Sequence, residues 1–153
     1  MKTKITISMI AGILMLALWS PVQAEVKPGI RLGTLSDPQS FMIGGEVLTN
    51  LNREWYLNPN VEYISQPNAD FWAINFDVHY DIPTRHPFYF WVGGGPAILH
   101  RNPDGSGRST TDPAANLFFG VGFRTQGRVV PYIQPKVVIS EKSHFGIAVG
   151  ARF

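Results

Sequence analysis

Apolar and polar residues alternate along most of the chain after Glu25, and turn-forming residues interrupt the alternation at intervals of roughly a dozen residues. A period of two is typical of antiparallel strands joined by hairpins, because successive side chains of a strand point to opposite faces. The pattern predicts an all-β chain with essentially no helix. We place eight strands at 26–35, 40–50, 54–65, 69–82, 87–101, 114–125, 128–140 and 143–153. The connection 102–113 is long and polar, and the strand order puts it at the end opposite both termini.

The two faces of the even-numbered strands differ in composition. One face comprises 18 positions, most of them aliphatic or aromatic and none of them charged. In the strand 69–82 this face consists of Trp72, Ile74, Phe76, Val78 and Tyr80. The opposite face of the same strand consists of Ala73, Asn75, Asp77 and His79. In the later strands that second face is mostly glycine, alanine and charge, so one face is bulky and the other is small.

The face that turns outward distinguishes two kinds of barrel. A soluble barrel fills its interior with the bulky face, whereas a membrane barrel turns that face toward lipid. Eight strands enclose a lumen with room for side chains only, which suits small residues and a few polar ones. Trp55 and Tyr63, like Trp72 and Tyr80, are eight residues apart on the bulky face, which is ~20 Å along the membrane normal and close to the spacing of two aromatic girdles. We therefore predict an eight-stranded up-and-down antiparallel transmembrane β-barrel, with a soluble periplasmic lipocalin-like barrel that binds an apolar ligand as the alternative.

Residues 1–24 have the layout of a secretory signal peptide. Lys2 and Lys4 form a basic start, an apolar stretch follows, and the small-residue pattern Val22-Gln23-Ala24 ends the segment. The apolar stretch is shorter than the ~20 residues that a membrane-spanning helix needs. We expect export and cleavage before Glu25, which leaves residues 25–153 as a single domain.

Charge and cysteine content exclude several functions. Two of the 13 basic residues lie in the signal peptide, which leaves 11 against 11 acidic ones, so nucleic-acid binding has no electrostatic support. The chain has no cysteine, which excludes disulfides, thiolate metal sites and a cysteine nucleophile. The four histidines show no metal-ligand spacing. We expect no metal and no cofactor.

Seven charged residues fall on the face predicted to line the lumen. They are Arg31, Glu46, Glu62, Asp77, Arg124, Lys136 and Arg152. The acidic residues lie on the second to fourth strands and the basic ones on the first and the last three, so the two sets face each other. An unpaired charge in a dry interior costs ~3–5 kcal/mol, so we expect each to have a partner. Arg31, Glu46, Asp77 and Lys136 should form the centre of a network that plugs the lumen; the alternative is a gated pore.

Four prolines fall inside predicted strands, where each removes a hydrogen-bond donor from the ladder. They are Pro59, Pro96, Pro131 and Pro135. We expect β-bulges at these positions, with a local shift of parity in the third, fifth and seventh strands, and a bend at Gly93-Gly94-Gly95.

The end of the chain alternates outward residues up to a terminal aromatic one: Phe145, Ile147, Val149 and Phe153. This resembles the C-terminal strand signal of bacterial outer-membrane β-barrels. With the segments 118–124 and 146–153, the chain is similar to the small eight-stranded family typified by the transmembrane domain of outer membrane protein A. The resemblance implies an outer-membrane location among phospholipid and lipopolysaccharide, and biogenesis through periplasmic chaperones and the barrel assembly machinery. We expect a monomer.

The family includes structural, adhesive and enzymatic members, so the resemblance leaves activity open. Ser143 and His144 follow Glu141 in the last hairpin, and some eight-stranded outer-membrane enzymes that modify lipid A use a serine, a histidine and an acid. Adjacent strand residues point to opposite faces, so Ser143 and His144 cannot easily act as nucleophile and base. We predict a non-enzymatic protein with a structural or surface-interaction role, and keep a lipid A-modifying enzyme as an alternative.

Overall fold

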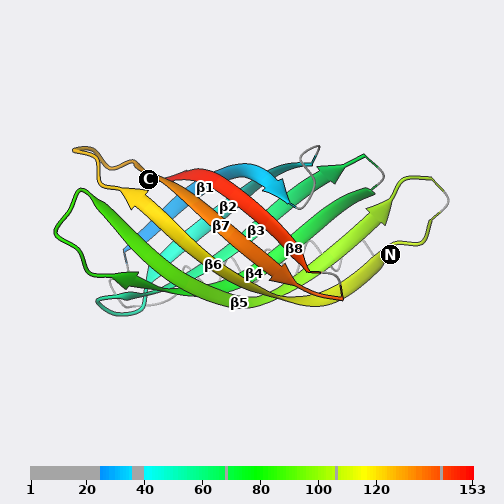
Figure 1. Cartoon of the computed structure of the whole chain (residues 1–153), viewed down its shortest axis with the longest axis horizontal. Helices are drawn as coiled ribbons and strands as arrows, with labels where there is room; N and C mark the ends of the chain where they lie inside the picture. Colours follow the sequence, from blue (N-terminus) through cyan, green and yellow to red (C-terminus); the bar gives the residue numbers. More distant parts are fainter. Residues whose placement is uncertain (1–24, 36–39, 68, 106, 142) are drawn as a thin grey trace.

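The computed structural model describes residues 25–35, 40–67, 69–105, 107–141 and 143–153, so the predicted signal peptide lies outside the described residues. The described chain forms a closed barrel of antiparallel strands in sequence order, and β8 pairs with β1 (Figure 1). The strands are β1 (Val26–Leu35), β2 (Phe41–Asn50), β3 (Trp55–Gln66), β4 (Ala69–Ile82), β5 (Phe88–Pro103), β6 (Thr110–Phe123), β7 (Val130–Ile139) and β8 (His144–Arg152). The described part of the chain contains no helix long and apolar enough to cross a membrane. The predicted fold class is confirmed.

The hairpin formed by β5 and β6 is longer than predicted. β5 continues to Pro103 and β6 begins at Thr110, which pairs with Arg101. The predicted loop 102–113 is therefore reduced to residues 104–109, at the end of the barrel opposite the C-terminus (Figure 1). The side chains at these strand ends are polar, so the sequence pattern assigned them to a loop. The ladder of backbone hydrogen bonds nevertheless continues beyond the apolar part of each strand.

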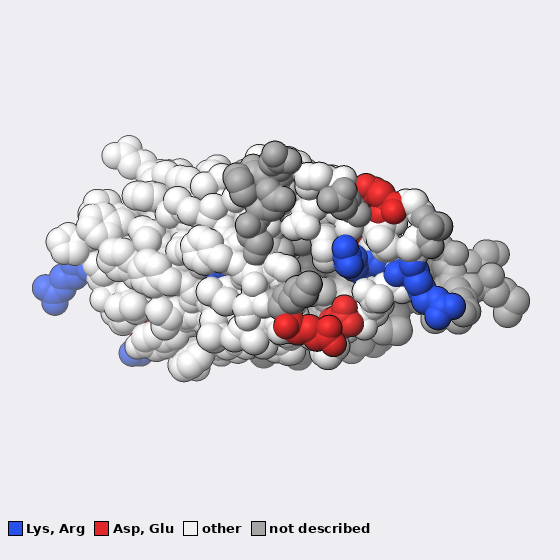
Figure 2. All heavy atoms as spheres, turned by 45° about the vertical axis from the view of Figure 1, so that its right-hand side comes forward, with Lys and Arg blue, Asp and Glu red and all other residues white. Residues whose placement is uncertain are grey.

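The apolar side chains face outward. Phe41, Trp72, Leu117 and Phe145 are all exposed, and the large exposed hydrophobic residues are distributed over every strand. In Figure 2 the left and middle parts of the visible face are mostly uncharged, with Lys and Arg at the left end and both basic and acidic residues grouped on the right. This is the reverse of a soluble barrel, whose bulky residues fill its interior.

Aromatic residues of β3 and β4 form two rows on the outer wall. Trp55 is the register partner of Tyr80, and their ring centroids lie 5.3 Å apart. Tyr63 is the register partner of Trp72, with centroids 5.0 Å apart. Because the two aromatic residues of each strand are eight residues apart, these pairs form one row near each end of the barrel, the arrangement of two aromatic girdles.

Inward glycines make room for large rings from the neighbouring strand. A Cβ atom on Gly120 would lie 2.0 Å from the indole of Trp91, and one on Gly150 would lie 2.4 Å from the phenol ring of Tyr132. Trp91 and Tyr132 are both buried and pack edge to face in the lumen. The small residues predicted for the inner face thus leave the space in which these rings pack.

The prolines do not produce the predicted bulges or parity shifts. The register between β2 and β3 is the same before and after Pro59, and the registers on both sides of Pro96 are likewise unchanged. Pro131 and Pro135 pair in register with β8, and the paired residues are missing only on the side of β6. Each proline therefore removes a local pairing on one side while the intact neighbouring pairs hold the strands in register.

Gly120→Ala should destabilise the barrel by ~1–3 kcal/mol, because the added methyl group overlaps the Trp91 indole in a packed interior. Unfolding by urea in lipid vesicles, followed by tryptophan fluorescence, measures the change. Gly45→Ala is the control, since Gly45 faces outward and its Cβ would meet nothing nearer than 4.0 Å. Equal losses in the two variants would contradict this packing.

Candidate functional site: the lumen

Five buried charged side chains form a continuous chain of ion pairs across the lumen. Arg31 on β1 contacts both acids: its Nη2 binds Glu46 Oε2, and its Nη1 lies 3.2 Å from Glu62 Oε1. Lys136 on β7 binds Glu62 through Nζ, and Arg152 on β8 places Nε 3.0 Å from Glu46 Oε1. These ion pairs therefore connect five strands: β7, β3, β1, β2 and β8.

Asp77 is held by amides in place of a basic partner. Its Oδ2 accepts a hydrogen bond from Asn60 Nδ2 at 2.9 Å, and its Oδ1 accepts one from Asn116 Nδ2 at 3.0 Å. Asn116 also donates to Asn75 Oδ1 at 2.8 Å, and Asn75 donates to Asn60 Oδ1 at 2.7 Å. These four side chains form a closed hydrogen-bonded ring that joins β3, β4 and β6.

The glycines of β5 give Asn116 access to Asp77. Asp77 lies on β4 and Asn116 on β6, so β5 runs between them. Gly93 and Gly95 occupy inward positions of β5, where a Cβ would lie 2.5 Å from His79 Cβ and 2.7 Å from Asp77 Cα. A side chain at Gly95 would therefore occupy the space beside Asp77. The sequence suggested only a bend at these glycines.

Two further layers fill the lumen on either side of the polar centre. Toward the 104–109 loop lies an apolar cluster, which consists of Leu35, Met42, Ile64, Ala73, Leu99, Val138 and Ala148. Toward the C-terminal end lie the aromatic residues Trp91, Phe118 and Tyr132. The guanidinium of Arg152 lies 4.7 Å from the ring centroids of both Trp91 and Tyr132, a distance at which cation–π attraction operates.

The charges of the lumen balance. Arg31, Lys136 and Arg152 are opposed by Glu46, Glu62 and Asp77, and all six are almost completely buried. Asn58 also donates to Glu46 Oε2 at 2.7 Å. Balanced charge with additional hydrogen bonds limits the cost of keeping ions out of water. Among the described residues, no group of three or more His, Cys, Asp or Glu side chains could hold a metal ion.

Arg124, contrary to the prediction, does not belong to this network. It follows the last residue of β6 and is exposed at the barrel end. Its Nη1 donates to the backbone oxygens of Thr84 and His86, at 3.1 and 3.2 Å, and the guanidinium lies over the ring of Tyr89. Its position in the alternation assigns Arg124 to the inner face. Because β6 ends at Phe123, however, the side chain lies at the barrel end and not in the lumen.

The residues of the predicted assembly signal lie on the outer wall. Phe145, Ile147 and Val149 are exposed on β8, and Phe153 is exposed directly after it. In the hairpin before β8, Ser143 is exposed and His144 is half-buried at the first position of the strand.

The amides of the lumen were not predicted as site residues. Asn60, Asn75 and Asn116 are 4%, 1% and 2% exposed, so they are as fully buried as the charges they surround. Parity could have identified them, because each falls on the inner face of its strand. Formal charge alone does not single out these amides, although they hydrogen-bond in the lumen as the charged side chains do.

Comparison with solved structures supports the fold. No protein-family model matches the sequence, and no curated protein matches it. Among solved structures, the N-terminal β-barrel domain of Pseudomonas aeruginosa OprF is similar over 86% of this chain and 100% of its own, with a TM-score of 0.68 and 16% identity. Neisserial surface protein A (NspA) is similar over 83% of this chain and 94% of its own, with a TM-score of 0.63 and 12% identity.

A third similar structure is Ail, the attachment invasion locus protein of Yersinia pestis. It covers 85% of this chain and 97% of its own length, with a TM-score of 0.56 and 12% identity. The resemblance expected from the terminal strand and the alternating pattern is therefore found in three dimensions. The chain has the fold of the small eight-stranded outer-membrane β-barrels.

Proposed function

We propose that this protein is an integral outer-membrane barrel with a plugged lumen and a structural or surface-interaction role. The observation that carries the proposal is the packed lumen: an apolar layer, a polar layer with balanced charge and an aromatic layer follow one another along its axis. Because side chains fill the lumen, any binding or catalytic site would have to lie on the outer wall or in the loops. A membrane location is supported by the apolar outer wall and by a closed sheet, which leaves no backbone edge unpaired in hydrocarbon.

We also propose a monomer that is exported with its signal peptide cleaved before Glu25 and inserted by the barrel assembly machinery. The balanced polar interior supports a barrel that is complete as one chain, since no charge of the central network needs a partner from a second subunit. A lipid A-modifying activity is less well supported, because the hairpin residue Ser143 and the strand residue His144 are adjacent in sequence.

Membrane placement predicts that Trp72 contacts acyl chains and Trp91 does not. Trp72 is 47% exposed on the outer wall, whereas Trp91 is 0% exposed in the lumen. In vesicles with brominated acyl chains, a mature variant that keeps Trp72 as its single tryptophan should be quenched strongly, and one that keeps Trp91 only weakly. A mature wild-type chain that stays folded and soluble without detergent would overturn the membrane placement.

The plug predicts two effects of Glu62→Gln. The substitution leaves Lys136 without its carboxylate and weakens the pairing of Arg31, so the free energy of unfolding should fall by ~3–5 kcal/mol. The same loosening should admit ions: planar bilayers with the wild-type protein should show no steady current, and the variant should show current steps. Glu141→Gln is the matched control, because Glu141 is exposed in a hairpin, and neither effect should follow. A steady current through the wild type would favour the gated pore.

The assembly signal predicts that Phe153→Ser reduces insertion in cells, because the assembly machinery would recognise the terminal aromatic residue. Phe123→Ser is the control: Phe123 ends β6 at the same end of the barrel and is 48% exposed, against 49% for Phe153. Immunoblots of outer-membrane fractions should show several-fold less of the Phe153 variant, while both variants refold equally into detergent micelles. An equal loss of both variants from the membrane would contradict a specific signal.

A further inference from the structure

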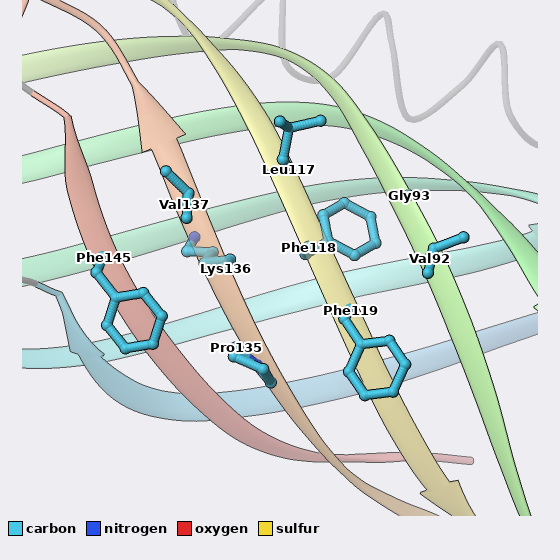
Figure 3. A pocket seen from close by; sticks show the side chains of 9 residues that line it. All are labelled: Val92, Gly93, Leu117, Phe118, Phe119, Pro135, Lys136, Val137 and Phe145. Carbon is cyan, nitrogen blue, oxygen red and sulfur yellow. The ribbon is translucent and has the colours of Figure 1, made fainter.

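A groove of about 430 Å³ opens on the outer wall over β5 to β8, centred on the seam between β6 and β7. Six of its lining residues are Val92, Leu117, Phe119, Pro135, Val137 and Phe145. In Figure 3, Pro135 lies between the rings of Phe119 and Phe145, with Leu117 and Val137 nearby. The groove is a shallow, open depression in the apolar outer wall.

The groove lies over a seam that the prolines of β7 interrupt, and Pro135 is one of its lining residues. Pro131 and Pro135 both pair in register with β8 and lack paired residues on the side of β6. Between the pairs Phe118–Lys136 and Val121–Ile133, two positions of the β6–β7 ladder are unpaired. Proline has no backbone N–H to donate, so the ladder is interrupted here, as it also is beside Pro59 in the β2–β3 seam and beside Pro96 in the β4–β5 seam.

The groove is lined mainly by apolar side chains. Leu117 and Phe145, at its rim, are 56% and 61% exposed. Lys136 is the one charged residue that lines it, and its Nζ is directed into the lumen, where it binds Glu62. The groove therefore suits an apolar chain.

Charge at the two ends of the seam indicates the orientation of that chain. The turn between β6 and β7 carries Arg124 and Arg128, both exposed, and no acidic residue. The opposite end of the seam has mixed charge: in the sequence Glu141 is followed by Lys142 in the hairpin after β7, and Arg108 and Asp112 flank the start of β6. A negative headgroup is therefore favoured at the arginine end, which is the end of the C-terminus.

The depth of the groove fits one leaflet. Five residues separate Phe119 from Arg124, which is ~16 Å along a strand and ~13 Å along the membrane normal at a tilt of ~40°. One leaflet contributes ~15 Å of hydrocarbon. A chain attached to a headgroup at Arg124 can therefore reach the groove.

We propose that the β6–β7 groove binds an acyl chain of a phospholipid whose anionic headgroup lies against Arg124 and Arg128. The proposal rests on the membrane placement proposed above. Arg124 is suited to this role because hydrogen bonds to Thr84 and His86 already hold its guanidinium at the barrel end.

Native mass spectrometry of the folded, detergent-solubilised mature protein tests this binding, with dioleoylphosphatidylglycerol as the probe and dioleoylphosphatidylcholine as the neutral comparison. We expect one phosphatidylglycerol to bind more tightly than any further lipid. Val137→Phe, which fills the groove, should weaken that binding at least ~10-fold. Val149→Phe is the control, because Val149 is exposed on β8 outside the groove, and its effect should stay within ~2-fold. Arg128→Gln should cost ~5-fold for phosphatidylglycerol and remove its preference over phosphatidylcholine.

Three outcomes would overturn the groove proposal while leaving the membrane placement intact. They are a folded, detergent-dependent barrel that binds no lipid preferentially, equal losses in Val137→Phe and Val149→Phe, and displacement of phosphatidylglycerol by purified lipopolysaccharide at lower concentration. A mature protein that is folded and soluble without detergent would instead refute the membrane placement. Heat-dependent gel mobility of each variant establishes that it is folded before lipid is added.

Discussion

Backbone N–H and C=O groups find no hydrogen-bonding partner in a hydrocarbon layer, and the whole architecture follows from this constraint. The register between Gly29–Leu35 of β1 and Gly146–Arg152 of β8 closes the sheet, so the described strands leave no free edge. Closure with eight strands in turn fixes a narrow interior. The bulky residues that a soluble protein would bury therefore lie outside, and the interior has to be built from small and polar ones.

A narrow interior that contains ions must balance them. Glu46 and Glu62 each contact two basic residues, and Asp77 receives two amide hydrogen bonds in place of a basic partner. The hydrogen bonds that stabilise the Asp77 carboxylate thus come from a ring of side chains on β3, β4 and β6. Because these contacts join strands that are not neighbours in the sheet, the lumen couples the wall across its diameter as well as around its circumference.

The one-sided effect of proline connects the fold to the groove proposal. We expected bulges because a missing donor is commonly absorbed by an extra residue. The intact pairs with β8 hold Pro131 and Pro135 in register, so the defect is confined to the side of β6. It takes the form of a seam with unpaired positions, and the apolar groove lies there. Pro59 and Pro96 interrupt the β2–β3 and β4–β5 ladders in the same one-sided way, so it is the apolar groove that sets the β6–β7 seam apart.

The sequence by itself determined the strand number, the parity of each strand and the sign of each buried charge, because period-two patterning depends only on neighbouring residues. Tertiary structure decided the partners. Pairing of Lys136 with Glu62, 74 residues apart, depends on barrel closure, and the reach of Asn116 to Asp77 depends on the glycines of an intervening strand. Arg124 shows the limit of parity: it has the correct alternation, but the strand ends too soon for its side chain to enter the lumen. The local pattern determines on which face of its strand a residue lies. The distances between inward side chains of different strands are set only when the sheet closes into a barrel.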